Sequence, residues 1–311
     1  MSDLYVFDGE PGKTVFILNT NPTTKNDGKA AFGDNGLYNI HIATDRAMSG
    51  GMTLTFRYSN DSMFVGRIDQ PNAALGAEGS QMGIAQIAKE TRFANGIRMW
   101  VGGTKDLFVG NAVGIQKFRT ALREGRYDEH AYDNAEDFFG KLNSSTIVVE
   151  MPNAMLPKTI HVFATSAMVL NGRWIQVNRL AHPLLTHLFM LGDEPLIIGH
   201  DQHRPDSDEQ RRLWVGSTVT RAVALNKSQP DPVAYGVRIA DRLLPELMPY
   251  EVGTKARYGV DAFNGRRTND DAMDVAMSIF AGKSVTDGAN TFDHHPQQFP
   301  YVVRNEPAAT K

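Results

Sequence analysis

The sequence lacks cysteine altogether, and it lacks an excess of charge of either sign. No cysteine occurs among its 311 residues, which excludes disulfide bonds, thiolate metal sites, iron–sulfur clusters and cysteine nucleophiles. The 32 Lys and Arg residues nearly balance the 35 Asp and Glu residues, giving a formal net charge of -3. Because no basic stripe is present, neither nucleic acid nor an anionic membrane surface is an expected partner.

Long apolar runs and common nucleotide-binding motifs are missing as well. No run approaches the roughly 18 apolar residues of a membrane span, and the opening MSDLYVFDGEPGK has neither the basic nor the apolar region of a secretory signal. We therefore expect a cytoplasmic protein, while the sequence leaves open whether the natural chain has residues before Met1. Without a Rossmann fingerprint, a P-loop or a G-x-S-x-G elbow, nicotinamide, ATP and serine-elbow chemistry are disfavoured.

Apolar residues recur with a period of two, or run continuously, through much of the first two thirds of the chain. This pattern predicts strands. Two turn signals, Ser49-Gly50-Gly51 and Asn171-Gly172, each join two such runs and predict β-hairpins; Asn-Gly tolerates the positive φ angles of a type I′ turn. The predicted strands are residues 14–18, 38–42, 52–58, 145–151, 159–170 and 173–179.

Helical patterns dominate from about residue 207 onwards. Thr268 is expected to be the N-cap of the last helix, with Asp271 completing a pattern like a capping box. The expected helices are residues 115–123, 135–141, 207–224, 231–247 and 269–280.

These elements predict an α+β fold, with a mainly antiparallel β-sandwich or curled sheet and a helical cover in the C-terminal third. With 41% hydrophobic residues the chain can bury a large core, and no linker composition interrupts it. We therefore expect a single compact domain over residues 1–311, which is β-rich over 1–206, helix-rich over 207–304 and ends in a tail at 305–311.

Several segments, taken in order, resemble the domain-of-unknown-function 4331 family. The opening SDLYVFDGEPGKTVFILNTNP is similar to that family's first strand pair, and DNGLYNIHI followed by MTLTFRYS is similar to its next hairpin. Further similarity lies in MWVGGTKDLFVGNAVGI, NRLAHPLLTHLF, FNGRRTNDDAMDVAMSIFAGK and FPYVV. The chain departs from the family at residues 102–108, where GGTKDLF lacks the usual arginine, paired aspartates and proline. It also departs at His182 and His187, where the family more often has an amide and an acid. The resemblance implies a β-rich fold and no established reaction.

Asp270, Asp271 and Asp274 form an acidic DDxxD sequence. On a helix, their spacing places Asp270 and Asp274 on one face, where two carboxylates can hold Mg²⁺ together with water and a substrate phosphate. The alternative, which the sequence favours, is structural. Acids in a first helical turn offset the positive end of the helix dipole, worth about 0.3–1 kcal/mol each, and Arg266 and Arg267 are the expected ion-pair partners.

His200, Asp201 and His203 lie together in IIGHDQHRP, after an apolar run that is expected to end a strand. Imidazoles and a carboxylate are the ligand set of catalytic zinc and non-haem iron sites, so these three residues are the predicted catalytic group. A metal site would combine His200 and His203 with a third ligand from residues 293–295, taken as His294. The spacing matches no diagnostic motif, and solvated loop histidines are the alternative.

Three hypotheses for function follow from these patterns. The first, which we prefer, is an enzyme that acts on a small organic molecule in a β-lined pocket, with a divalent metal as a cofactor at the histidines or the aspartates. The second is a non-catalytic β protein that binds a small ligand, and the third is a structural or interaction module. A small molecule is the expected partner in the first two, and a homo-oligomer is compatible with all three.

Overall fold

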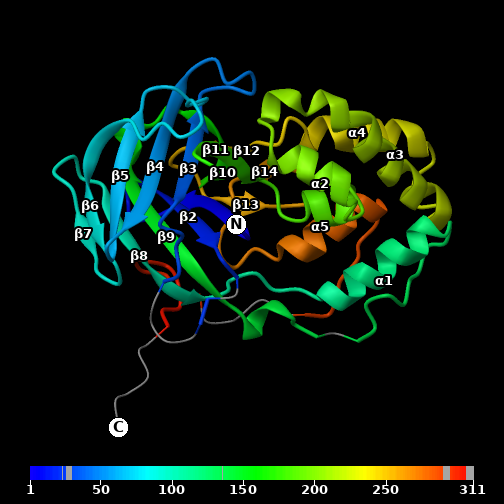
Figure 1. The fold of residues 1–311 in the computed structure, drawn as a ribbon. Helices are drawn as coiled ribbons and strands as arrows, with labels where there is room; N and C mark the ends of the chain where they lie inside the picture. The colour runs from blue at the N-terminus through cyan, green and yellow to red at the C-terminus, as the bar shows by residue number, and fades with distance from the viewer. Residues whose placement is uncertain (23, 26–29, 135, 290–294, 306–311) are drawn as a thin grey trace, which may run out of the picture.

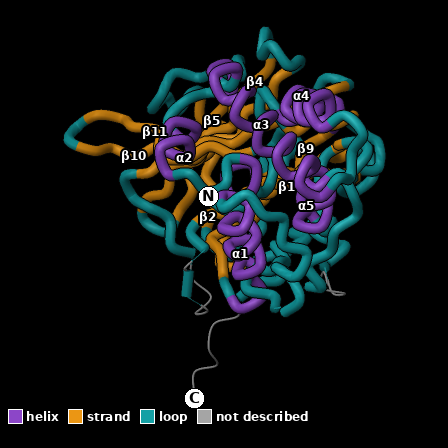
Figure 2. Tube along the Cα trace, turned by 90° about the vertical axis from the view of Figure 1, so that its right-hand side faces the viewer, coloured by secondary structure: helices purple, strands orange, loops and turns teal. Residues whose placement is uncertain are grey.

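Strands and helices occupy different sides of the structure. A computed structural model describes residues 1–22, 24–25, 30–134, 136–289 and 295–305. Two antiparallel sheets lie on one side and the α-helices lie on the other (Figure 1). In the view turned by 90°, the helices lie in front of the strands and cover that side of the sheets (Figure 2). The fold is α+β, as the sequence predicts.

The first sheet contains, in spatial order, β1 (Asp3–Asp8), β2 (Lys13–Thr20), β9 (Asn143–Pro152), β8 (Arg98–Lys105) and β7 (Thr91–Arg92). All neighbouring strands are antiparallel. Strand β2 is buried at every position after its first, which accounts for the continuous apolar run there. The central strands of this sheet therefore belong to the protein interior.

The second sheet contains, in spatial order, β11 (Arg173–Leu180), β10 (Thr159–Leu170), β3 (Gly36–Ala43), β4 (Gly51–Ser59), β5 (Ser62–Ile68) and β6 (Ser80–Gln86). A further strand, β12 (Met248–Glu251), pairs with the start of β10. Both predicted hairpins are confirmed. Ile40 pairs with Leu54 across β3 and β4, and Asn171 and Gly172 turn β10 into β11 with φ angles of 52° and 72°. A separate two-stranded ribbon joins β13 (Arg257–Tyr258) to β14 (Phe263–Asn264).

The α-helices are α1 (Ala112–Arg123), α2 (Glu194–Asp201), α3 (Glu209–Asn226), α4 (Pro232–Leu243) and α5 (Ala272–Ala281). Asn111, Asp193, Asp231 and Asp271 begin four of them, and each side chain accepts a hydrogen bond from the backbone N–H three residues later. Single turns of 3₁₀-helix lie at Phe139–Lys141, Asn153–Met155 and Pro205–Ser207, and a π-helical turn lies at Leu185–Phe189. In the described parts of the chain, no helix combines the length and the apolar character that crossing a bilayer requires.

Buried apolar side chains from both sheets and from the helices form one hydrophobic cluster. Trp100 on β8, Phe163 on β10 and Phe280 on α5 are among its largest members, and each is at most 2% exposed. Helices α3 and α4 approach each other closely at Gly216 and Gly236, where a side chain on Gly236 would meet the backbone of α3. This contact between the two helices therefore leaves no room for a side chain at Gly236.

Several helix boundaries differ from the sequence prediction, and two of the differences have a clear physical cause. Helix α4 ends at Leu243 rather than at residue 247, because a proline follows at 245 and disfavours helical backbone in the residue before it. Helix α5 begins after Asp271 rather than after Thr268, because the Asp271 side chain caps the helix through the Asp274 N–H.

Two further expectations about secondary structure are wrong. In place of a helix over residues 135–141, the described residues contain only the 3₁₀ turn at Phe139–Lys141, and residue 135 lies outside the described residues. The apolar run before His200 is helix α2 rather than the end of a strand. A short apolar run fits a buried strand and a short helix equally well, so periodicity alone does not separate them.

The close approach of α3 and α4 predicts that Gly236→Val destabilises the protein. A Cβ atom on Gly236 would lie 2.2 Å from Thr220 Oγ1 and 2.3 Å from the Gly216 carbonyl oxygen. Because that carbonyl belongs to the α3 backbone, the helices must separate, and we expect urea unfolding to show a loss of about 2–3 kcal/mol. Gly199→Ala in α2 is the control, since its nearest atom, Arg211 Nη2, is 3.4 Å away. Equal losses in the two variants would contradict this prediction.

Candidate functional site

His200 has both ring nitrogens engaged by carboxylates. It lies in the last turn of α2 and is 1% exposed. Its Nδ1 is 2.9 Å from an Asp201 oxygen, and its Nε2 is 2.8 Å from a Glu246 oxygen. Burial alone would lower the pKa of His200, but the charge of Glu246 and the hydrogen bonds to both carboxylates outweigh burial and raise it. His200 therefore offers no free nitrogen to a metal or a substrate.

A buried charge network surrounds this histidine. Arg179 on β11 donates to both oxygens of Asp208, at 2.9 and 2.5 Å, and its Nη1 is 3.6 Å from Glu246. Arg211, near the start of α3, lies 3.3 Å from Asp208. The side chains of Arg179, Asp208, Glu246 and His200 are each at most 1% exposed. We call Arg179, His200, Asp208, Arg211 and Glu246 the buried charge network.

Backbone groups complete this network. One Glu246 oxygen accepts from the N–H groups of Ala181 and His182 at 2.8 and 3.0 Å, and Asp208 accepts from the Glu246 N–H at 2.9 Å. Burial would raise the pKa of Glu246, but His200, Arg179 and the backbone donors lower it to about 2. The network thus joins the end of β11, helix α2, the start of α3 and the segment before β12. Its charges are compensated internally, as expected of a structural centre.

His203 stays outside this network. It is exposed, and its Nδ1 is 2.6 Å from the Gly199 carbonyl oxygen. The structure therefore brings together two members of the predicted catalytic group, His200 and Asp201, but not the third. Among the residues that the structure describes, no group of three or more His, Cys, Asp or Glu side chains could hold a metal ion. The expected pairing of His200 with His203 as metal ligands is thus not found, and His294 lies outside the described residues.

The three aspartates of the DDxxD sequence bind backbone N–H groups. Asp270 precedes α5 and accepts from Arg267 and Tyr258 at 2.8 and 3.0 Å. Asp271 caps α5, and Asp274 accepts from the Asp287 N–H at 2.9 Å. Burial raises the pKa of Asp271 to about 6. The expected shared helical face of Asp270 and Asp274 is absent because α5 begins after both Asp270 and Asp271. The expected ion pairs are not formed either, because Arg266 and Arg267 pair with Asp3 and Asp8.

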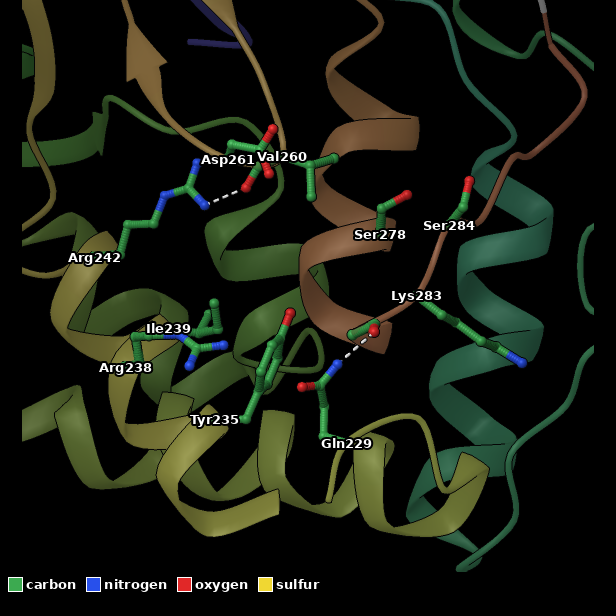
Figure 3. Close-up of a pocket in the computed structure, with 11 residues that line it drawn as sticks. Gln229, Tyr235, Arg238, Ile239, Arg242, Val260, Asp261, Ser278, Lys283 and Ser284 are labelled. Atoms are coloured by element: carbon green, nitrogen blue, oxygen red, sulfur yellow. Dashed lines mark hydrogen bonds between the residues drawn. The ribbon is translucent and has the colours of Figure 1, made fainter. Parts of the chain in front are cut away.

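A hollow of about 420 Å³ lies between α4, the loop at residues 259–261 and the C-terminal end of α5 (Figure 3). We call it the α4–α5 hollow. Its volume is within the range of about 300–1,000 Å³ that is typical of small-molecule sites. It is lined by Gln229, Tyr235, Arg238, Ile239, Arg242, Val260, Asp261, Ser278, Gly282, Lys283 and Ser284.

Two arginines, one helical turn apart on α4, line this hollow. Arg242 is engaged, since its guanidinium donates to the carbonyl oxygens of Val260 and, at 2.8 Å, of Gly259. Arg238 is exposed and lies 4.9 Å from the centre of the Tyr235 ring. Among the described residues no carboxylate forms an ion pair with Arg238. Arg238 is therefore the cation of this hollow that is available to a ligand.

The backbone carbonyl groups at the C-terminal end of α5, beside the hollow, already accept hydrogen bonds from other side chains. The Ala281 carbonyl accepts from Asn226 and Ser228 at 2.9 and 2.7 Å, and the Gly282 carbonyl accepts from Gln229 at 2.6 Å. Lys283 extends away from the hollow (Figure 3), and its Nζ is 2.7 Å from Glu129. The local field at the hollow is therefore set mainly by the two arginines of α4 and by Asp261.

Several sizeable hollows lie in the C-terminal part of the chain. Three of them, of about 420, 500 and 580 Å³, are lined only by residues that follow Asp208. Helices and loops supply most of their lining, with Arg257 of β13 at the last of them, whereas the sequence suggests a β-lined pocket. Sequence reasoning did not single out Arg238 and Arg242, although their i, i+4 spacing on the helix expected at 231–247 was a usable signal. Arg179, Asp208 and Glu246 carry no local signal.

Comparison with known proteins adds no assignment of function. No protein-family model, curated protein or solved structure matches the chain. The resemblance to the domain-of-unknown-function 4331 family therefore stays a prediction, and the function has to be inferred from the side chains themselves.

The raised pKa of His200 predicts a pH-dependent stability. The folded state holds the imidazole proton more tightly than the unfolded state, so this stabilisation is complete below the ordinary pKa of about 6.5 and is lost as pH rises through the raised value. Between about pH 6 and pH 9 the unfolding free energy of the wild type should fall more steeply than that of His200→Gln. Urea titrations at a series of pH values measure both slopes, with His203→Gln as the control. Parallel profiles for wild type and His200→Gln would contradict the prediction.

The capping role of Asp271 predicts how α5 responds to substitution. Asp271→Ala removes the acceptor of the Asp274 N–H and should lower the unfolding free energy by about 1 kcal/mol. Asp271→Asn keeps a good capping side chain and should stay within a few tenths of the wild-type value. For each of the three proteins, the melting temperature with added Mg²⁺ should equal the melting temperature with EDTA. If Mg²⁺ raises the wild-type melting temperature but not that of Asp271→Asn, the metal hypothesis regains support.

Proposed function

We propose that the protein binds a small organic anion reversibly in the α4–α5 hollow. The observation that carries this proposal is the exposed guanidinium of Arg238, which lines a hollow of ligand size and has no carboxylate partner among the described residues. Arginine presents a planar fork of N–H donors that matches a carboxylate or a phosphate. A small organic anion would supply the missing partner.

The charges around the hollow favour an anion over a cation. Arg238 and Arg242 contribute two positive charges to the lining and Asp261 contributes one negative charge, whereas Lys283 points away and pairs with Glu129. Although Arg242 hydrogen-bonds the loop carbonyls, its charge still acts on the hollow. A carboxylate between Arg238 and Arg242 would have one guanidinium as a direct partner and the second close by, while Asp261 would disfavour a ligand with several negative charges.

The remaining lining suits an apolar or aromatic body on the same ligand. Tyr235, Ile239 and Val260 present carbon surface to the hollow. The hydroxyl of Tyr235 donates to the Ile279 carbonyl at 2.7 Å, and burial raises its pKa, so it stays an uncharged group with a fixed ring position. An aromatic monocarboxylate would place its ring beside Tyr235 and its charge beside Arg238.

The hydroxyl groups in this hollow favour reversible binding over catalysis. Ser278 Oγ lies 3.2 Å from the Val285 carbonyl and 3.0 Å from its N–H, so it already has both a donor and an acceptor partner. No histidine is present among the described residues that line the hollow, so no imidazole is available there to activate a hydroxyl group. An enzyme that uses His200, Asp201 and His203, with or without a metal, stays a prediction from the sequence.

Thermal shift measurements with matched ligands and variants test the proposal. Benzoate, at about ten times its dissociation constant, should raise the melting temperature by about 2–5 °C, whereas neutral benzamide should have a much smaller effect. The shift should be lost in Arg238→Gln and retained in Arg173→Gln, an exposed arginine on the β10–β11 hairpin. Benzoate, hippurate and indole-3-acetate form the probe set. Absence of any shift with all three, or an equal shift in Arg238→Gln, would overturn the proposal.

A further inference from the structure

Helices α3 and α4 expose an apolar face that lies away from the α4–α5 hollow. Leu213 is 84% exposed, and Val233 and Val237 on α4 are 63% and 50% exposed. A groove of about 500 Å³ runs between the two helices, with these three side chains along its edges. Figure 1 shows α3 and α4 at the edge of the molecule, away from the strands. Large apolar side chains grouped on one exposed face are typical of an interaction surface.

The residues of α3 along this groove follow a regular order. Glu209, Leu213, Ser217 and Arg221 recur every four residues and form one ridge of the helix. Along the ridge, an acid is followed by a large apolar residue, a small residue and a cation. Each of these four residues lines the groove and is exposed, although Glu209 also lies 3.7 Å from Arg212 and Arg221 donates to the Arg123 carbonyl oxygen.

We infer that this face binds a second copy of the same chain, with the two α3 helices antiparallel about a twofold axis that passes between Leu213 and Ser217. In this arrangement, the residue numbers of any two α3 residues that face each other add up to the same total. Glu209 then faces the second copy's Arg221, and Leu213 faces the second copy's Ser217. The acid meets the cation and the large side chain meets the small one, and the twofold axis repeats both contacts.

The shape of the face supports this occupant. Leu213 projects from the surface, and the buried small residues Gly216 and Ala240 line the groove beside it. A projecting side chain and a hollow on the same face are the two halves of a self-complementary contact. Each copy would insert Leu213 between the second copy's Ser217 and its valines on α4.

The charges at the rim also favour a second copy over a strongly charged partner. Glu209 and Asp241 are balanced by Arg212 and Arg221, and Arg212 forms ion pairs with both acids. The face therefore carries no net charge from these four residues. It would neither attract a highly charged protein nor repel a copy of itself.

Charge reversal with a mixing step tests the inference on the full chain. In sedimentation velocity, the wild type should dimerise in the micromolar range. Glu209→Arg and Arg221→Glu should each weaken the dimer by about tenfold or more, because each places like charges at both ends of the ridge. An equimolar mixture of the two variants should regain wild-type affinity, since opposite charges then face each other at both ends. The double variant with both reversals should regain it as well.

Lys117→Glu, an exposed reversal on α1, is the matched control and should dimerise like the wild type. Leu213→Ser should weaken the dimer without changing the circular dichroism spectrum, because Leu213 is exposed in the single chain. A wild type that stays monomeric up to about 100 µM would overturn the inference. Dimers that ignore the reversals, or a mixture that fails to regain affinity, would overturn it too.

Discussion

The side chain of Arg179, on β11 of the second sheet, is fully buried. Its positive charge is tolerated there because carboxylates from two distant segments of the chain lie beside it. Asp208 binds it through both oxygens, and Glu246 lies 3.6 Å away and also holds His200. Removing such charges from water costs several kcal/mol per ion, so removal of one partner leaves another uncompensated. The positions of α2, of the start of α3 and of the segment before β12 all depend on this compensation being complete.

Everything proposed about function depends on that placement. The network holds the beginning of α3, and α3 in turn supports α4 through the contact of Gly216 with Gly236. The α4–α5 hollow and the groove between α3 and α4 are both walled by α4. The sheets supply much of the core, and the helices supply the surfaces that are open to other molecules. The two proposed binding surfaces therefore both lie on the helical side.

Much of the fold could be predicted from the sequence because strands and turns are determined by residues close together in the chain. The alternation at residues 52–58 and the Asn171-Gly172 turn each specify structure within a few residues, and both hairpins formed as expected. Helix boundaries were less certain, because whether Thr268 or Asp271 caps α5 depends on which backbone N–H each side chain reaches. The sites were the hardest to predict. Glu246 is 46 residues from His200, and no local pattern marks two residues as partners when only the fold brings them together.

Helix α4 contributes to both proposed binding surfaces and packs closely against α3. Arg238 and Arg242 line one side, and Val233 and Val237 line the other. Because Gly236 packs against the α3 backbone with no room for a Cβ atom, an occupant that shifts α4 from one side would also move the surface on its other side. Thermodynamic reciprocity then requires equal effects in both directions: an anion that tightens association would itself be held more firmly by the associated form. One short helix would thereby connect the protein's assembly to the supply of a metabolite.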